Sequence, residues 1–395
     1  MTAEVRDANR IAFLDVLRGV ALFGILLVNV FSFGADYPAW SGMADQLVWQ
    51  VKHVVFETKF WMLYSLLFGM GFFLQTQSPG YTMARSLRRL GVLMLFGCLH
   101  GLLFEGDILM LYAELGVLLL LLYRLPTNWL LLLVLLLMLS FPLGHLLGGD
   151  RGDEWPAESA AEASAWLQED RMDSPLAVAS FTEVLAYHAT FLPERFWADW
   201  QYPDSGFLVL ASFLLGFCLM RSGWGALARL TPAQAIRIAL GLWVLGLSLM
   251  AIERYWAATV GYAPFERSDA APMRVLGGDL VYLFATLSLT GAWFFSVWCW
   301  AQSRRLVGVR SLIASAGQMS LTGYLSQTVM FTTVFYGYGL GAAFEWGPAQ
   351  VTVLAVGVYA LQLLLVHWWL QRFRRGPLEW LWRCLTYWHW EPIRR

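Results

Sequence analysis

The sequence predicts an all-α integral membrane protein, a polytopic bundle of about ten transmembrane helices. Of its 395 residues, 58% are hydrophobic and 14% are charged, whereas an average soluble domain carries about 25% charged residues. The apolar residues also gather in runs of about 20, the length that crosses a bilayer as a helix. A bundle of membrane-spanning helices therefore fits the chain better than soluble domains do.

The apolar runs follow one another along the whole chain. They lie near residues 12–33, 57–76, 87–104, 107–123, 128–148, 206–221, 235–253, 278–301, 312–335 and 349–371. We expect two five-helix membrane halves, 1–148 and 206–371, separated by an acidic loop, 149–205, and followed by a charged tail, 372–395.

The basic residues predict the orientation. With the N-terminus in the cytoplasm, most of the 27 Lys and Arg residues fall in cytoplasmic segments, as the positive-inside rule requires. No cleavable signal peptide is evident, because the first apolar run is long and has no small-residue cleavage site. The chain is expected in a membrane with both termini in the cytoplasm.

Two segments are too polar to span but carry helical periodicity. The start of the 149–205 loop is expected to be flexible. Its second part, PLAVASFTEVLAYHATFLPERFWADW, predicts a periplasmic amphipathic helix at the outer interface. The tail, WLQRFRRGPLEWLWRCLTYWHW, is rich in Trp and Arg and predicts a second interfacial helix on the cytoplasmic surface.

Composition also limits the partners. A net charge of −1 gives no case for a nucleic-acid partner, and we expect membrane lipids instead. The four cysteines are scattered and the six histidines lack zinc-motif spacing, so no metal site is expected. The sequence is compatible with a homodimer.

One stretch, residues 99–116, places polar groups within apolar sequence. LHGLLFEGDILMLYAELG reads as two apolar runs joined by an acidic turn, so it predicts a helical hairpin. Such groups are costly in lipid and usually face a cavity or one another. The hairpin is therefore expected to line a buried polar site.

The turn of this hairpin brings His100 and Asp107 within hydrogen-bond reach. A carboxylate that orients a histidine is a recurrent catalytic pair, in which the histidine serves as general base. The alternative is a histidine whose hydrogen bonds are satisfied inside the core. We take His100 and Asp107 as the candidate catalytic residues.

Further polar residues on the predicted spans could contact a substrate or hold helices together. Tyr112 and Glu114 lie deeper in the hairpin, Asn29 lies near the outer end of the first span, and Tyr324 and Gln327 share a face of the ninth. They are the candidate substrate-binding residues.

Charged residues also gather at the predicted cytoplasmic ends of the first and third spans. Arg85, Arg88 and Arg89 either set the orientation of the chain in the membrane or bind phosphate. The guanidinium group is well suited to phosphate, because it can donate two hydrogen bonds at once. Asp15 and Arg18 are three residues apart, so they can pair on one helix face. They form either a collar at the interface or one wall of a cytosolic entrance.

Six segments together resemble a known family. RIAFLDVLRGVALFGILLVN, KFWMLYSLLFGMGF, LRRLGVLMLFGCLH, GDILMLYAELG, GQMSLTGYLSQT and RFRRGPLEWLWR look, in order and spacing, like the YeiB-like bacterial inner-membrane proteins. The C-terminal half of that family is known as a domain of unknown function. The resemblance spans essentially the whole chain.

The N-terminal half of that family is similar to transmembrane acyltransferases such as heparan-α-glucosaminide N-acetyltransferase. The resemblance implies an acyl-CoA donor bound at a site facing the cytoplasm, and a reaction centre with a histidine in the membrane. In those enzymes the catalytic histidine follows the first span on the outer side, where this chain has His53. The local sequence favours His100, and the choice between them stays open.

Three functions follow from these observations. As an acyltransferase, the chain would hold acyl-CoA at Asp15, Arg18, Arg85, Arg88 and Arg89. It would then pass the acyl group to a glycan, lipid or small molecule activated by His100. As a transporter or permease, it would relay protons through its intramembrane His and Asp residues. As a structural membrane protein, it would use the same polar groups to join helices.

Overall fold

The computed structural model describes residues 3–33, 35, 40–146, 175–201, 203–260 and 272–395. Every regular element in these ranges is helical, as the sequence predicts. The helices of the N-terminal part are α1 (Ala3–Asn29), α2 (Met43–Val51), α3 (Lys59–Thr76), α4 (Met83–Gly101), α5 (Leu109–Leu122) and α6 (Thr127–Leu146). Then come α8 (Phe181–Gln201), α9 (Pro203–Cys218), α10 (Trp224–Leu227), α11 (Pro232–Val260), α12 (Pro272–Gln302), α13 (Val307–Gln318), α14 (Ser320–Phe335), α15 (Pro348–Arg372) and α16 (Pro377–Tyr387).

Several of these helices are long and apolar enough to cross a membrane. By length and composition, five stretches qualify among the described residues: Ala12–Phe33, Gly206–Leu227, Pro232–Thr259, Met273–Gln302 and Pro348–Arg372. α5 and part of α6 are shorter apolar helices. The chain is thus a membrane protein of helical-bundle class, while the count of ten spans and the orientation stay predictions.

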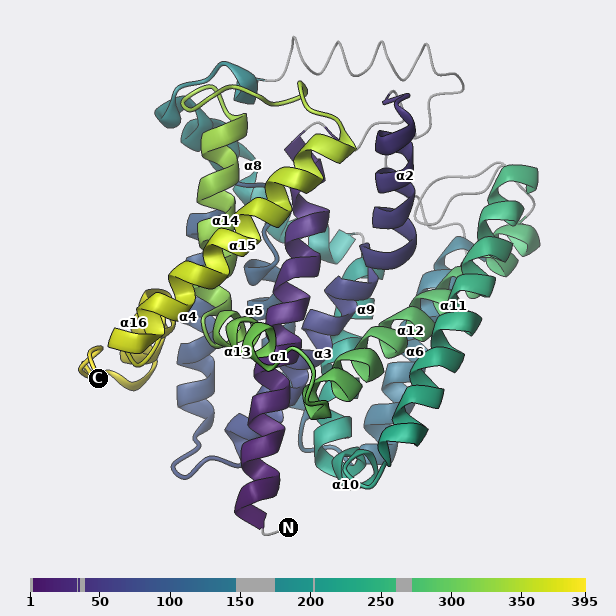
Figure 1. The fold of residues 1–395 in the computed structure, drawn as a ribbon, viewed down its shortest axis with the longest axis vertical. Helices are drawn as coiled ribbons and strands as arrows, with labels where there is room; N and C mark the ends of the chain where they lie inside the picture. Colours follow the sequence, from purple (N-terminus) through teal and green to yellow (C-terminus); the bar gives the residue numbers. More distant parts are fainter. Residues whose placement is uncertain (1–2, 34, 36–39, 147–174, 202, 261–271) are drawn as a thin grey trace.

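α1 runs through the centre of the bundle and packs on helices from the far end of the chain (Figure 1). α1 crosses α13 at very short range. A Cβ atom on Gly317 would lie only 1.9 Å from the carbonyl oxygen of Asp15. Gly19 faces Ile313 in the same way. Only glycine permits backbones to approach so closely, so this crossing depends on both residues.

The predicted ninth span, 312–335, is two helices rather than one. α13 ends at Gln318 and α14 begins at Ser320, with Met319 between them at φ −116° and ψ 36°. Those angles lie outside the helical region, so the chain changes direction there. The break lies where the tail helix α16 contacts α14.

Both predicted amphipathic segments contain helices. α8 occupies the second part of the 149–205 loop, and α16 occupies the tail. Residues 147–174, which include the stretch predicted to be flexible, lie outside the described residues. α2 was not predicted as a helix. A π-helical turn, Lys52–Phe56, joins its end to the residues before α3.

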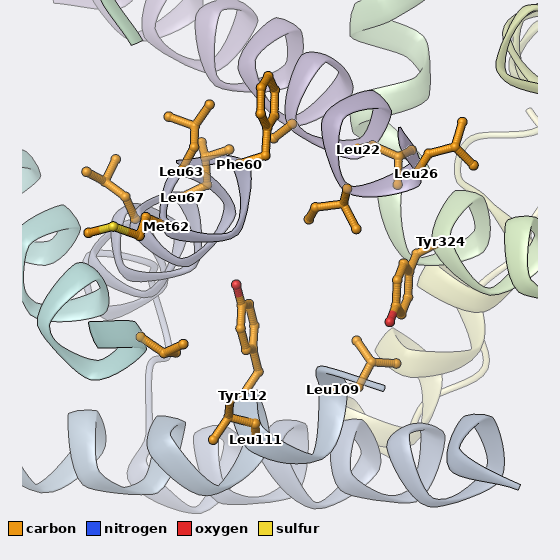
Figure 2. Packing of buried hydrophobic residues seen from close by; sticks show 14 of the residues in the cluster. Leu22, Leu26, Phe60, Met62, Leu63, Leu67, Leu109, Leu111, Tyr112 and Tyr324 are labelled. Carbon is orange, nitrogen blue, oxygen red and sulfur yellow. The ribbon is translucent and has the colours of Figure 1, made fainter. Parts of the chain in front are cut away.

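The buried core joins the two predicted membrane halves into one body. α3 packs on α9 and α6 packs on α9. Leu22, Leu26, Leu63 and Tyr112 belong to one contiguous buried cluster, in which Tyr112 faces α3 (Figure 2). The division of the chain at residues 148 and 206 stays a prediction.

Candidate functional site

The predicted contact between His100 and Asp107 is present at the α4–α5 turn. Nδ1 of His100 lies 2.6 Å from Oδ1 of Asp107, and both side chains are buried. Nε2 of His100 lies 2.8 Å from the hydroxyl of Thr328 on α14. Both ring nitrogens therefore have partners, and Thr328 is a contact that the sequence did not reveal.

Local structure explains how the turn holds Asp107. Its Oδ2 accepts a 2.9 Å hydrogen bond from the backbone N–H of Met110, in the first turn of α5. A carboxylate satisfies one of the free N–H groups at a helix start and interacts well with the helix dipole. Gly97 lets α5 come close, because a Cβ atom there would lie 2.6 Å from the nitrogen of Met110.

Arg195 of α8 fixes the same turn from outside. Its guanidinium donates to the carbonyl oxygens of Glu105 and Asp107, the latter at 2.5 Å. Tyr324 of α14 donates a 3.2 Å hydrogen bond to the carbonyl oxygen of Gly106. Three successive carbonyl groups of the turn are thus held by side chains from helices far along the chain, so the turn is rigidly positioned.

A cavity of about 370 Å³, which we call the outer cavity, opens beside this turn. Three predicted site residues line it, namely Asn29, Asp107 and Tyr324. Glu57 and Arg195 also line it and were not predicted. His100 is not among the lining residues, so Asp107 faces the cavity and His100 lies behind it.

A larger cavity of about 520 Å³, the basic cavity, lies at the other end of α4. Of the five residues predicted to hold the cofactor, Asp15, Arg18, Arg85 and Arg89 line it. Arg18 and Asp15 form the predicted i, i+3 pair, with Nη1 of Arg18 3.1 Å from Oδ1 of Asp15.

Arg88 is placed differently from its neighbours. It does not line the basic cavity, and its guanidinium lies 6.0 Å from the ring of Trp388 instead. Arg88 lies three residues after Arg85, so helical periodicity alone does not separate the two. They differ in their partners, since Arg85 lies beside the ring of Tyr387 and Arg88 beside that of Trp388. The expectation that Arg88 would hold the cofactor is not supported by its position.

The tail also lines the basic cavity. It adds Arg374, Arg375 and Arg383, none of which the sequence singled out as site residues. Rings of the tail also contact the arginines of α4: Arg89 lies 4.3 Å from the ring centroid of Trp382, and Arg85 lies 5.6 Å from that of Tyr387. Such cation–π contacts fix guanidinium groups while leaving their N–H donors available.

Glu379 of α16 caps the broken helix at the edge of this cavity. One carboxylate oxygen accepts hydrogen bonds from the backbone N–H groups of Leu321 and Thr322, at 2.7 and 3.0 Å. Burial raises the pKa of Glu379, and the hydrogen bonds from Thr322 and Leu321 offset part of that rise. A residue of the tail thus does what an N-cap residue within α14 would do.

The two cavities approach each other at the start of α5. Leu109 and Tyr112 line the basic cavity, while Ile108 and Leu111 line the outer one. Figure 2 shows Tyr112 and Tyr324 on two sides of this region, with Leu109 beside Tyr324. The hydroxyl of Tyr112 lies 2.7 Å from that of Ser65. Only the first turn of α5 and its neighbours separate the two spaces.

The remaining predicted substrate residues lie elsewhere. Gln327 donates a 2.8 Å hydrogen bond to Gln362 of α15, so it joins two helices. Glu114 is buried, and neither residue lines the basic or the outer cavity. For Gln327, the alternative of an interhelical contact fits the structure better than substrate binding does.

His53, the alternative histidine, lies in the π-helical turn before α3. Its Nε2 is 3.2 Å from Oε2 of Glu57, the residue that lines the outer cavity. His53 and His100 therefore approach the same cavity, each behind a carboxylate. Within the ranges that the structure describes, no group of three or more His, Cys, Asp or Glu side chains is arranged to hold a metal ion.

Comparison with known proteins decides the family. The chain is 32% identical to "Uncharacterized protein YeiB" of Escherichia coli (strain K12), over 94% of this chain and 95% of that protein. The chain belongs to the YeiB-like family. It is also 30% identical to "Uncharacterized protein YxaH" of Bacillus subtilis (strain 168), over 98% of this chain and 96% of that protein.

The family model described as "Protein of unknown function (DUF418)" matches residues 258–389. This range includes the α13–α14 break and most of the tail. It also includes the segment GPLEWLWR, which contains the capping residue Glu379 and the cavity residues Trp382 and Arg383. No solved structure matches the chain.

Proposed function

We propose that this YeiB-like protein is an acyltransferase that moves an acyl group from acyl-CoA to an acceptor across a bacterial cytoplasmic membrane. One observation carries the proposal. A cavity lined by arginines approaches, at the start of α5, a second cavity backed by a carboxylate–histidine pair. An anionic acyl donor in the first cavity and a proton-accepting pair beside the second could therefore act on the same acyl group.

The basic cavity suits the donor. Acyl-CoA carries phosphates, which arginine binds in bidentate fashion. Arg18, Arg85 and Arg89 line the cavity together with the tail arginines. The thioester arm would extend past Tyr112 towards the outer cavity. Under the predicted orientation, with both termini cytoplasmic, this mouth opens to the cytosolic pool of acyl-CoA.

The outer cavity suits the acceptor. A hydroxyl or amine bound there would attack the thioester carbonyl, and the carbon–sulfur bond would break as CoA leaves. The proton from the acceptor would pass to the Asp107–His100 pair and then to the departing thiolate. Asn29 lines this cavity and could donate to the developing oxyanion.

Acyl transfer by the purified protein tests this function. Labelled acetyl-CoA is incubated with protein in nanodiscs, and binding, hydrolysis and transfer to added amines or sugars are measured. Arg85→Ala should weaken acyl-CoA binding, whereas Arg88→Ala is the matched control from the same helix and outside the cavity. Absence of binding, hydrolysis and transfer in the unmodified protein would refute the enzyme function.

Transport is the second candidate, and the break between α13 and α14 favours it. Broken helices and cavities that approach from opposite ends are features of secondary transporters. In that case Asp107 and His100 would carry a coupling proton. Proton-driven uptake into vesicles that is lost in Asp107→Asn, together with no acyl transfer, would select this function over the first.

A further inference from the structure

A separate group of buried ionisable side chains lies away from both cavities. Lys59 of α3, Glu253 of α11 and Asp279 of α12 are each at most 1% exposed. α11 and α12 form a hairpin on one side of the bundle, and α12 also contacts α3 and α6 (Figure 1). Ionisable residues buried in membrane-spanning helices are costly and mark functional sites by default.

Glu253 is the unusual member of this group. Within the part of the chain that the structure describes, neither of its carboxylate oxygens has a hydrogen-bond partner. The carboxylate also forms an ion pair with its neighbour Arg254, whose Nε is 3.7 Å from Oε2 and whose side chain is 37% exposed. A fully buried carboxylate without hydrogen bonds costs several kcal/mol, and binding a proton removes that charge.

The charges that face Glu253 come from three directions. Asp279 comes from α12, Lys59 from α3 and Arg254 from its own helix. The ammonium of Lys59 donates its hydrogen bond to the carbonyl oxygen of His53, at 2.9 Å, and not to Glu253. The Lys59 ammonium therefore does not satisfy the Glu253 carboxylate by a hydrogen bond.

Apolar packing surrounds the group. Met250 lies one turn before Glu253 on α11, and Tyr282 lies one turn after Asp279 on α12. Both belong to a buried cluster that also contains Phe141 of α6. Water has little access there, which strengthens the preference for the uncharged carboxyl.

A strained turn connects this group to the outer cavity. Thr58 has φ +61°, a conformation that β-branched residues rarely adopt and that often marks functional sites. It separates Glu57, which lines the outer cavity, from Lys59, which lies in the buried group. The Thr58 hydroxyl also lies 2.9 Å from that of Tyr282.

We propose that Glu253 is a proton-binding carboxyl that exchanges its proton with the outer cavity through Lys59 and Glu57. In this exchange the Lys59 ammonium leaves the carbonyl oxygen of His53 and gives a proton to the Glu253 carboxylate, which becomes a neutral carboxylic acid. The resulting amine then regains a proton from the Glu57 side. The ligand of this site is a proton alone. The site does not depend on acyl transfer and holds equally if the protein is a transporter.

Infrared difference spectroscopy of the protein in nanodiscs tests the site. A protonated carboxylic acid has a carbonyl stretching band that a carboxylate lacks, so raising the pH should remove the band. Glu253→Gln should abolish that band, while Glu183→Gln, an exposed residue on α8, should leave it unchanged. A folded Glu253→Gln protein with the wild-type band would overturn the proposal.

A second variant covers the case in which Glu253→Gln does not fold. Glu253→Asp keeps a carboxyl group at this position. The Glu253→Asp variant and the unmodified chain are both labelled with ¹³C-glutamate. The band should shift with the label in the unmodified chain and should not shift in Glu253→Asp. If the label shifts the same band in both proteins, another glutamate carries the proton and the assignment is wrong.

The exchange path has its own readout. Transfer to deuterated buffer replaces the carboxyl proton, and the rate of the resulting band shift measures access. Lys59→Gln should slow that rate severalfold without removing the band. An unchanged rate in a folded Lys59→Gln protein would show that the proton reaches Glu253 by a route that avoids Lys59.

Discussion

The carboxylate of Glu379 accepts a 2.6 Å hydrogen bond from the hydroxyl of Thr322, which joins the tail helix to the first turn of α14. The same carboxylate accepts the backbone N–H groups of Leu321 and Thr322. The helix break and the tail therefore depend on each other, and together they form one wall of the basic cavity.

Removal of this cap should destabilise the protein. Glu379→Ala leaves two buried N–H groups of α14 without a partner, which should lower the free energy of unfolding by about 1–2 kcal/mol. Glu391→Ala is the control, because that carboxylate lies in the same tail and contacts Arg383 instead. Thermal unfolding in detergent measures both variants. An equal effect of the two would show that the cap has no special role.

The contribution of Glu379 should also depend on pH. Burial raises the pKa of this carboxyl, so the folded state binds the proton more tightly than the unfolded state does. The resulting stability is fully present below the ordinary glutamate pKa of about 4.3 and is lost as pH rises through the folded-state pKa. The Tm of wild type minus the Tm of Glu379→Gln should therefore decrease as pH rises, because only the wild-type side chain loses a proton. If wild type instead gains Tm relative to Glu379→Gln as pH rises, the carboxylate is stabilised in its charged form.

Thr328 should position the imidazole of His100. Thr328→Val keeps the side-chain shape but leaves Nε2 of the buried histidine without a partner, at a cost of about 1–3 kcal/mol. Thr333→Val is the control, because Thr333 lies on the same helix and is exposed; it should change stability by less than about 0.5 kcal/mol. If acyl transfer is measured, its pH profile should shift in Thr328→Val alone. Equal pH profiles in the two variants would show that Thr328 does not act through His100.

Arg195 should attach α8 to the α4–α5 turn. Arg195→Gln removes the guanidinium that holds the carbonyl groups of Glu105 and Asp107. Hydrogen–deuterium exchange should therefore rise in residues 102–108 and in α8. Glu194→Gln, a change at the adjacent and exposed residue, should leave exchange as it is. Faster exchange confined to α8 would show that the turn is rigid without Arg195.

The predicted orientation can be tested directly. An epitope inserted in the 149–174 segment should react with antibody on intact spheroplasts, and one placed after Arg395 should react only after the membrane is opened. The reason is the excess of basic residues in the segments assigned to the cytoplasm. Labelling of the second epitope on intact spheroplasts would require an odd number of spans.

The sequence predicted the features that depend on neighbouring residues. Apolar runs located the helices, and the short acidic turn brought His100 to Asp107. The position of Arg88 outside the basic cavity had no such local signal, because Arg85 and Arg88 are three residues apart and share a helix face.

Features that depend on distant contacts could not be predicted. The sequence Gly317-Gln318-Met319-Ser320 contains no proline, and an isolated glycine is also tolerated within a helix, so the helix break had only a weak local signal. Its cap comes from Glu379 in the tail, and the turn beside Asp107 is held by Arg195. Each contact joins segments that only the tertiary fold brings together, and a single sequence gives no information on such pairs.

The approach of the two cavities at the start of α5 has an electrical consequence. Where water enters a membrane protein from both ends, the insulating layer is only as thick as the protein between the two spaces. Most of the transmembrane voltage would then fall across the first turn of α5, where a unit charge crossing 100 mV gains or loses about 2.3 kcal/mol. Any charged group that passes Leu109 and Ile108 would therefore experience nearly the whole membrane potential in a single step.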